Sequence, residues 1–354
     1  MNLDGIVKKN RVAVAMSGGV DSATVAAWLL ERGYEVIGLT MALWQPQGMI
    51  SSTRTCCASE DRYDARQVAQ KLGIPFYIVN LEYPFLQEVI GDFLRNYAAG
   101  RTPNPCIECN RTVKFTHLLA RAQAMGAEFL ATGHYAVRKV DSSGHPQLWR
   151  GCDPSKDQSY FLFATTLRQL QFLRFPLGDR TKEETRALAK KFDLHVARKP
   201  ESQDLCFIPE KDRTAFFARY APTAFKPGEV VDLEGRRLGE HAGIGHYTIG
   251  QRRGLGISAS NRQYVVEIRA EENQLVLGPE AALYRDRLTV ERVNWLGATP
   301  MENPTRLSVR TRYAVEPVPA TLTPLSDTTC QVVFDHTDRA ITSGQACVFY
   351  AGDI

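Results

Sequence analysis

One glycine-rich loop constrains this chain of 354 residues more than any other feature. The apolar run at residues 11–16 is typical of a buried strand, residues 23–32 are typical of a helix, and the sequence SGGVDS lies between them at residues 17–22. Two adjacent glycines allow a positive φ and a close backbone approach, so N–H groups and the positive end of the following helix can converge on a pyrophosphate. The loop therefore predicts a nucleotide site. The alternative is a tight turn in which Ser17 or Asp21 only caps the helix.

The spacing of this loop separates it from two common nucleotide-binding motifs. A Walker loop carries a Lys-Ser or Lys-Thr pair after its last glycine, and a dinucleotide-binding loop carries a third glycine. Residues 17–22 have neither feature. ATP that is cleaved between its α and β phosphates fits this loop better.

The pattern around the loop predicts a parallel α/β sheet. Strand patterns at 11–16, 36–43, 76–81 and 129–132 alternate with helical patterns, one of which runs over 60–72 and ends at Gly73. Ligands of such sheets bind at the carboxyl ends of the strands. The loop, Met41 and the pair Gly133-His134 each follow or end a strand, so we expect them to line one crevice.

The remainder of the chain predicts two smaller domains. Prolines and glycines interrupt residues 208–280, which indicates a small linking domain, and strand-like runs follow at 288–293, 306–313, 320–322, 330–334 and 346–350. These runs predict a small antiparallel barrel. The expected fold is therefore α/β, with a parallel-sheet nucleotide-binding domain (1–207), a linking domain (208–280) and a C-terminal antiparallel β-barrel (281–354).

Composition excludes several classes of protein. No apolar run reaches the length of a membrane span and the first residues are too polar for a secretion signal, so we expect a cytoplasmic protein. The net charge of +4 is only mildly basic, so a nucleic-acid surface requires local clustering of charge. Eight cysteines are too few for a fold of this length that depends on disulfide bonds.

Three cysteines are candidates for chemistry. Cys106 and Cys109 precede a helical pattern, where helix N–H groups and nearby Arg111 and Lys114 favour the nucleophilic thiolate; Cys206 lies far away in the sequence. A structural zinc site is disfavoured because the chain has no second C-x-x-C pair, although the neighbours Cys56 and Cys57 keep it open. Two alternatives remain open. One is an iron–sulfur cluster on the three thiolates, and the other is sulfur transfer, in which one cysteine carries a persulfide and another releases the sulfur.

Five further motifs follow the loop in a fixed order. They are residues 104–110 (NPCIECN), 131–135 (ATGHY), 156–162 (KDQSYFL), 205–208 (LCFI) and 250–256 (GQRRGLG). With the loop, they resemble the bacterial tRNA-specific 2-thiouridylases, a family within the PP-loop ATP pyrophosphatases, over nearly the whole chain. Members of this family use ATP to adenylate oxygen 2 of the wobble uridine and replace that oxygen with sulfur.

The resemblance implies a role for each matching position. The ATP contacts would be Ala15, Met16, Ser17, Gly18, Gly19, Val20, Asp21, Ser22, Met41 and Gly133, with Mg²⁺ on the nucleotide. Cys109 would be the nucleophile and Cys206 the persulfide carrier, and the two would end as a disulfide. The target base would face Asn104, Pro105 and Cys106. The contacts to a tRNA with a wobble uridine would be His134, Lys156, Asp157, Gln158, Arg312, Tyr313 and Gln345, and an upstream persulfide carrier or a cysteine desulfurase would supply the sulfur.

Two departures from the family pattern affect these expectations. Many members carry aspartate at the position of Cys106, where the carboxylate is a plausible acid or base. With cysteine there, proton transfer must be assigned to another group, and an iron–sulfur cluster on three thiolates becomes easier to form. The chain ends at Ile354, where relatives usually add a glycine-rich final strand, so closure of the barrel is left open.

The residues alone leave other interpretations open. Strand alternation places Arg306, Arg310 and Arg312 on one face, which fits either RNA phosphates or a solvated surface, and Tyr313 reaches the same side as Arg312 only if the strand ends there. Phe161 and Phe163 are expected in the core, and Cys152, Cys330 and Cys347 as inert thiols. Two rival functions are a PP-loop amidotransferase or ligase for a small molecule, such as an argininosuccinate or GMP synthetase, and a non-catalytic tRNA-binding protein.

Overall fold

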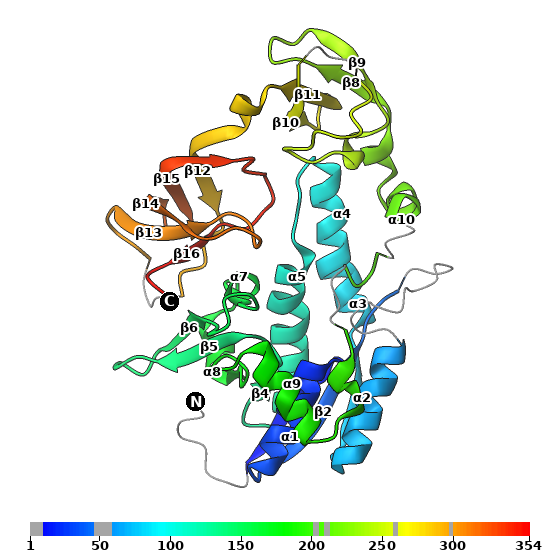
Figure 1. Ribbon diagram of the computed structural model, residues 1–354, viewed down its shortest axis with the longest axis vertical. Coiled ribbons are helices and arrows are strands. Elements are labelled where there is room, and N and C mark those ends of the chain that lie inside the picture. Colours follow the sequence, from blue (N-terminus) through cyan, green and yellow to red (C-terminus); the bar gives the residue numbers. More distant parts are fainter. Residues whose placement is uncertain (1–9, 46–58, 201–204, 209–212, 258–260, 297–299) are drawn as a thin grey trace.

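The sheet predicted around the glycine-rich loop is present and places the loop at its centre (Figure 1). The computed structural model describes residues 10–45, 59–200, 205–208, 213–257, 261–296 and 300–354. Five parallel strands have the order β3-β2-β1-β4-β7. Their bounds are β1 (Arg11–Ala15), β2 (Glu35–Ala42), β3 (Phe76–Asn80), β4 (Leu130–Ala131) and β7 (Leu173–Arg174). Because β1 is the middle strand, its apolar side chains are buried on both faces, as the continuous apolar run predicted.

Helices cover both faces of this sheet. Val12 and Val14 pack with α1, α2, α9 and η3, whereas the intervening Ala13 packs with the segment from η1 to α6 on the other face. Alternate side chains of a strand point to opposite faces, which accounts for this division. The bounds are α1 (Val20–Glu31), α2 (Ser59–Leu72), α3 (Glu82–Pro84), η1 (Phe85–Ile90), α4 (Gly91–Ala98), α5 (Pro105–Glu108), η2 (Cys109–Leu118), α6 (Leu119–Ala124), α7 (Ser159–Leu162), α8 (Leu167–Phe172), α9 (Lys182–Lys191) and η3 (His195–Arg198). A hairpin of β5 (Ala136–Val140) and β6 (Pro146–Arg150) lies between α6 and α7 in the chain.

The helical pattern predicted after Cys109 forms part of a longer segment with unusual hydrogen bonding. Residues of η2 are π-helical, and α5 and α6 continue the segment on either side. The Thr116 hydroxyl donates to the main-chain oxygen of Arg111 at 3.0 Å, five residues earlier. Stretches of π-helix are rare and occur often at functional sites, and this one begins at a candidate nucleophile.

The middle of the chain forms a small mixed sheet. Its strands have the order β10-β11-β8-β9, and β8 pairs with β11 in parallel and with β9 antiparallel. The bounds are α10 (Arg213–Tyr220), η5 (Pro222–Phe225), β8 (Gly228–Val231), β9 (Arg237–His241), η6 (Ile244–His246), β10 (Tyr264–Arg269), β11 (Gln274–Gly278) and η7 (Glu280–Leu283). The turn that follows α4 contacts this sheet, since a Cβ on Gly100 would lie 2.9 Å from the side chain of Ile268.

The C-terminal part is antiparallel, as predicted. Its strands have the order β12-β15-β14-β13-β16 and enclose a core that includes Val309, Leu322 and Val332. The bounds are β12 (Tyr284–Glu291), β13 (Thr305–Arg310), β14 (Val318–Ser326), β15 (Thr329–Arg339) and β16 (Val348–Tyr350). The predicted fold class, a parallel α/β domain followed by a small linking part and an antiparallel C-terminal part, is confirmed.

The prediction of an exposed arginine stripe on β13 is wrong for Arg310. That side chain is buried and lies 3.5 Å from the carboxylate of Asp157, whereas Arg306 is exposed and pairs with Asp335. The buried carboxylate across the domain boundary draws the guanidinium inward, because a buried charge requires a partner. Strand β13 ends at Arg310, so Arg312 and Tyr313 lie beyond it, in the turn that the prediction for these two residues required.

The C-terminal sheet docks against α7, as Figure 1 shows beside β16. Ile107, Tyr160, Val348 and Tyr350 form one apolar cluster, and the Tyr160 hydroxyl donates to the main-chain oxygen of Ala346 at 3.1 Å. Since Ile107 lies between the two cysteines of α5 and η2, this contact brings the C-terminal part next to the candidate thiols. None of the helices in the described part of the chain has the length and apolar character that a membrane span requires.

Candidate active site

The glycine-rich loop has the backbone geometry of a tight strand-to-helix connection. Gly18 has φ +78, and a Cβ on it would lie only 2.1 Å from the main-chain oxygen of Asp61. Gly19 is extended and precedes the first turn of α1. The Ser22 hydroxyl accepts from the Ser17 N–H at 3.1 Å and donates to the Gly19 oxygen at 3.3 Å. The first glycine is thus required by both its φ and its contact with α2, and the two serines close the loop on itself.

The first turn of α1 lies beside Gly133, which follows β4. Among the described residues no side chain caps the helix at Gly19, so first-turn N–H groups remain available for an anion. Gly133 follows β4 and approaches this turn closely, since a Cβ on it would lie 2.9 Å from the Ser22 nitrogen. The buried Met41 is near the end of β2. The arrangement at the carboxyl ends of the strands suits a nucleotide whose phosphates lie on α1 and whose base lies nearer β2.

Two residues that sequence reasoning missed hold Asp21 in the loop. The Lys182 ammonium lies 2.7 and 2.8 Å from the two carboxylate oxygens of Asp21, and the Tyr135 hydroxyl donates to one of them at 2.9 Å. Lys182 is only 5% exposed, so its charge requires this carboxylate. The sequence did contain one signal, because Thr181 and Glu184 form a capping box that places Lys182 at the first position of α9.

The predicted base-facing segment is held in place by the C-terminal sheet. The Asn104 side chain accepts from the Cys106 N–H at 3.1 Å and so begins α5, with Pro105 at its first position. The Gln345 amide donates to the main-chain oxygen of Thr102 at 2.6 Å. Cys106 is exposed and Cys109 is buried. Two parts of the chain that are remote in sequence therefore define the position of Cys106.

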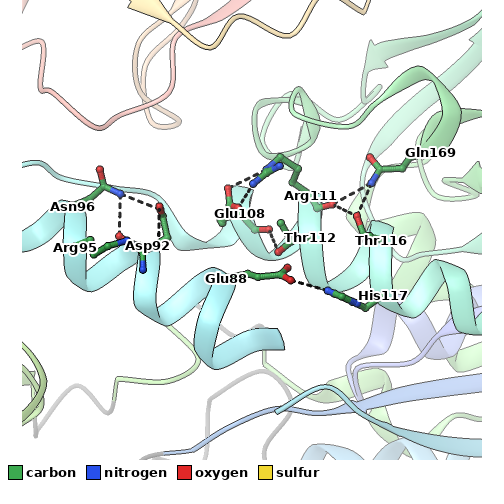
Figure 2. A network of polar contacts seen from close by, with 10 residues as sticks. All are labelled: Glu88, Asp92, Arg95, Asn96, Glu108, Arg111, Thr112, Thr116, His117 and Gln169. Carbon is green, nitrogen blue, oxygen red and sulfur yellow. Dashed lines mark hydrogen bonds and ion pairs between the residues drawn. The ribbon is translucent and has the colours of Figure 1, made fainter. Parts of the chain in front are cut away.

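The guanidinium predicted to favour a thiolate is already paired with a carboxylate. Figure 2 shows Arg111 and Glu108 pointing toward one another, and they form an ion pair. Its hydrogen bond to Glu108 raises the pKa of Arg111 although burial acts in the opposite direction. The negative charge of Glu108 offsets much of the positive charge of Arg111. Arg111 therefore favours a Cys109 thiolate less than the sequence alone suggested. The Gln169 amide in Figure 2 donates to the Arg111 oxygen and to Thr116, which ties η2 to α8.

Cys206 borders the same apolar cluster as Cys109. Phe207 and Ile208 are buried, and the ring of Phe207 lies 5.8 Å from Phe85 and 5.4 Å from Phe93. Cys206 itself packs against this cluster, to which the buried Cys109 belongs. The two predicted redox partners therefore lie on one core, although the predicted segment at 202–204 is outside the described residues.

The described thiols show no arrangement for a metal ion or cluster. Within the described ranges, no group of three Cys, His, Asp or Glu side chains is placed to hold one, and Cys56 and Cys57 lie outside those ranges. Cys152 is exposed, and its pKa is raised, first by burial of its sulfur and then by Asp179 and other carboxylates. Burial also raises the pKa of the Cys330 and Cys347 thiols. A raised pKa leaves less of each thiol as the nucleophilic thiolate at neutral pH.

The predicted tRNA contacts differ in their exposure. Lys156 and Gln158 are partly exposed, whereas Asp157 between them is 1% exposed. Its carboxylate accepts from the Gly151 N–H at 3.0 Å and from the N–H and hydroxyl of Ser159 at 3.1 and 3.0 Å, beside Arg310. In this structure Asp157 therefore joins the catalytic part to the C-terminal sheet.

His134 is packed in an apolar setting. Burial, followed by the nearby charge of Lys114, holds its pKa well below the usual value. The Thr132 hydroxyl lies 2.7 Å from the His134 Nδ1, and the rings of Phe115 and Phe175 pack against the imidazole. The neutral ring is thus favoured at neutral pH, so a contact with RNA would be a hydrogen bond and not an ion pair.

Family models match nearly the whole chain in three consecutive parts. The models are described as a tRNA methyl transferase HUP domain, a tRNA methyl transferase PRC-barrel domain and an aminomethyltransferase beta-barrel domain, and they match residues 10–210, 214–279 and 285–354. The fold and the site are thus those of an α/β nucleotide-binding protein with two accessory domains.

Individual relatives give the family a more specific name. The tRNA-specific 2-thiouridylase MnmA of Magnetococcus marinus is 55% identical over 348 residues, which cover 98% of this chain and 97% of the relative. The protein of the same name from Paramagnetospirillum magneticum is 48% identical over 359 residues, covering 100% of this chain and 95% of the relative. The chain belongs to the family of the tRNA-specific 2-thiouridylases.

Two solved structures with weaker similarity also match part of the chain. A 4-thiouridine synthetase in complex with RNA and ATP is 17% identical, covers 60% of this chain and 50% of that chain, and has a TM-score of 0.37. An NMN synthetase from Francisella tularensis is 15% identical, covers 58% of this chain and 72% of that chain, and has a TM-score of 0.35.

Proposed function

We propose that this protein is an ATP-dependent tRNA 2-thiouridine synthase that acts on the wobble uridine in the cytoplasm. The observation that carries the proposal is the joint presence of a glycine-rich loop before an uncapped helix at the end of β1 and two cysteine segments that border one core cluster. The family models name methyl transfer and the close relatives name thiolation. The two cysteine segments favour sulfur transfer over methyl transfer. A methyl group that is transferred from a carrier does not need a second cysteine for its release.

The first half-reaction uses the phosphate loop. Residues 15–22, Met41 and Gly133 would hold ATP, and bound Mg²⁺ would offset the charge of its phosphates. Oxygen 2 of the flipped-out uridine attacks the α-phosphorus, a bond to adenylate forms, and pyrophosphate leaves. Lys182 acts here by holding the Asp21 side chain in place at the start of α1, within 2.8 Å. The base oxygen has then become a leaving group.

The second half-reaction uses the two cysteines. The terminal sulfur of a Cys206 persulfide attacks carbon 2, and AMP departs with the former base oxygen. The Cys109 thiolate then attacks the Cys206 sulfur, which breaks the S–S bond to the base, leaves 2-thiouridine and forms a Cys109–Cys206 disulfide. An external dithiol reduces that disulfide with two electrons, and an upstream persulfide carrier or cysteine desulfurase reloads Cys206.

The three parts of the chain divide the recognition of the tRNA. Residues 1–207 form the catalytic domain, residues 208–280 form the linking domain, and residues 281–354 form the domain that contacts the tRNA. Asn104, Pro105 and Cys106 face the flipped base. The contacts to the remainder of the tRNA come from His134, Lys156, Gln158, Arg312, Tyr313 and Gln345. The buried Asp157 holds the backbone of its neighbours Lys156 and Gln158 in place.

Mass spectrometry of nucleosides tests the reaction directly. Unmodified tRNA is incubated with the protein, ATP, Mg²⁺ and a sulfide source, and we expect 2-thiouridine together with an equal amount of AMP. Cys206→Ser should abolish thiolation and retain ATP–pyrophosphate exchange, while Cys152→Ser, at an exposed thiol with a raised pKa, should behave as wild type. Thiolation at the normal rate by Cys206→Ser would remove Cys206 from the mechanism. AMP formation that depends on a small molecule and not on tRNA would instead indicate a ligase.

A further inference from the structure

One stretch of the middle part of the chain concentrates positive charge. Residues 241–266 contain Arg252, Arg253 and Arg262 and no Asp or Glu, which gives this stretch a charge of +3, against +4 for the whole chain. In a mildly basic protein, a nucleic-acid surface requires such local clustering. The motif GQRRGLG at 250–256 lies within the stretch, and no step of the proposed reaction uses it.

Both ends of residues 250–256, the arginine loop, are anchored in the middle sheet. The Gly250 N–H donates to the Val265 oxygen at 2.8 Å, which joins the start of the loop to β10. Leu255, near the end of the loop, is 8% exposed and belongs to the apolar core that includes Val265. A loop with two fixed ends has few conformations, so less entropy is lost when the residues between those ends bind a ligand.

One glutamine side chain closes the arginine loop from within. The Gln251 Oε1 accepts from the Thr248 N–H at 3.1 Å, and the Gln251 Nε2 donates to the Arg253 oxygen at 3.0 Å. The side chains of Arg252 and Arg253 are exposed. The loop therefore presents two guanidinium groups to solvent on a backbone that is held in place.

The two arginines differ from other arginines of the middle part in their partners. Arg236, Arg237 and Arg269 each lie beside a carboxylate, at 2.6, 2.6 and 3.1 Å. Within the described ranges, neither Arg252 nor Arg253 forms an ion pair. Because no carboxylate offsets their charge, both guanidinium groups keep their full attraction for an anion.

The arginine loop lies at the junction of the middle and C-terminal sheets. A Cβ on Gly250 would lie 3.0 Å from the Cβ of Ala340. The neighbouring Arg339 accepts a hydrogen bond on its main-chain oxygen from the Arg312 guanidinium at 2.8 Å. Since Arg312 is one of the predicted tRNA contacts, the loop lies next to the surface on which the family resemblance places the tRNA.

We propose that Arg252 and Arg253 form a binding site for backbone phosphates of the tRNA, apart from the site of the target base. The planar guanidinium group suits phosphate because it donates two parallel charge-assisted hydrogen bonds. Phosphate contacts position a nucleic acid and carry no sequence information. The inference rests on the proposed function and adds an anchoring site that raises affinity for the tRNA without touching the reacting atoms.

Fluorescence anisotropy of an unmodified tRNA with a wobble uridine tests the site in the full chain over a range of NaCl concentrations. Arg252→Gln/Arg253→Gln should weaken binding about tenfold near physiological salt. It should also reduce the slope of log affinity against log salt by about 1 for each phosphate contact that is lost. Arg252→Lys/Arg253→Lys keeps both charges and should retain most of the slope.

A matched control removes the same charge from the same part of the chain. Arg236→Gln/Arg237→Gln changes two exposed arginines that already have carboxylate partners, and it should leave the affinity and the slope near those of wild type. Equal losses in the two glutamine pairs would overturn the site, because the general charge of the protein would then explain both.

Steady-state thiolation separates affinity from chemistry. In Arg252→Gln/Arg253→Gln, KM for the tRNA should rise about tenfold, while kcat at saturating tRNA and the affinity for an ATP analogue in calorimetry stay at their wild-type values. A lowered kcat with an unchanged KM would overturn the assignment of these arginines to anchoring.

The remaining outcomes distinguish the inference from the proposed function. Normal binding by wild type, with an unchanged salt slope in Arg252→Gln/Arg253→Gln, overturns the phosphate site and leaves the proposed function standing. No binding of the tRNA to wild type refutes both. If that variant has a normal KM with inorganic sulfide but is slow with a protein persulfide donor, the loop binds a protein partner, and the assignment to RNA is overturned.

Discussion

Alanine at Gly18 should destabilise the start of α1 far more than alanine at another left-handed glycine. Gly18 has φ +78, and an added Cβ would meet three backbone atoms of Asp61 at 2.1, 2.7 and 2.8 Å. Left-handed backbone costs an L-residue about 1–2 kcal/mol. Overpacking against atoms that cannot rotate away adds about 1–3 kcal/mol. The two contributions give a loss of about 2–5 kcal/mol, a large part of the stability of a typical domain.

Two other glycines of the same strand–loop–helix unit provide matched controls. Gly33 has φ +85, and no described atom lies within 4 Å of its added Cβ, so alanine there should lose only the backbone cost of about 1–2 kcal/mol. Gly19 is extended, and its added Cβ would meet only the Ser17 hydroxyl at 3.5 Å, so alanine should change stability by less than about 0.5 kcal/mol. The Gly19 methyl would, however, occupy the predicted phosphate crevice and should weaken ATP binding by about tenfold or more.

Hydrogen exchange of α1 amides, followed by mass spectrometry, measures these losses locally. This readout suits a chain with several packed parts, for which a single unfolding free energy is poorly defined. Isothermal titration with an ATP analogue supplies the affinity. Equal losses of protection in Gly18→Ala and Gly33→Ala would refute the argument from contact with Asp61. Unchanged affinity in Gly19→Ala would argue against phosphates in this loop.

Three further predictions concern charged or titrating groups. Lys182→Met should weaken ATP binding by about tenfold or more in calorimetry, because the loop carboxylate loses its partner at 2.7 Å; unchanged binding would leave that pair a purely structural role. Asp157→Asn should lower stability by up to about 3 kcal/mol and loosen the C-terminal sheet in limited proteolysis, because Arg310 is left buried without a carboxylate. Glu316→Gln, at an exposed carboxylate 3.8 Å from Arg150, should change neither stability nor proteolysis, and equal effects of the two variants would contradict the prediction. The depressed pKa of His134 means that the unfolded chain binds a proton that the folded chain does not, so stability falls as pH drops below about 6.5. In His134→Asn, the urea midpoint should depend less on pH between neutral and mildly acidic conditions than it does in wild type. An unaltered pH dependence would exclude His134 as the cause of the loss of stability.

Local pattern was sufficient to predict the central strand, the loop and the helix. A buried parallel strand requires a continuous apolar run, and a glycine pair before a helix has few stable conformations, so residues 11–32 carried their own structure. The antiparallel C-terminal part was predicted from short strand-like runs without a helical period, which are also a local pattern. The helix after Cys109 was predicted, but its π-helical hydrogen bonding was not.

The sequence also contained the thiols and the motifs of the family, but not their surroundings. Alternation assigned Arg310 to one face of β13 without showing that Asp157 would cover that face. The effect of Arg111 on the nearby thiols was overestimated because the ion pair with Glu108 depends on the geometry of α5 and η2. The distance between the residues of such a pair depends on how helices and strands pack together.

By itself, then, the sequence determined the elements, the position of the glycine-rich loop and the candidate reactive groups, because each depends on neighbours within a few residues. Only the tertiary structure decided which charges meet at the loop and which thiols border one core. Lys182 and Lys199 reach Gly18 and Asp21 from more than 150 residues away. No local periodicity encodes such contacts, since they arise when long-range packing of η3, α9 and α2 around β1 brings separate segments together.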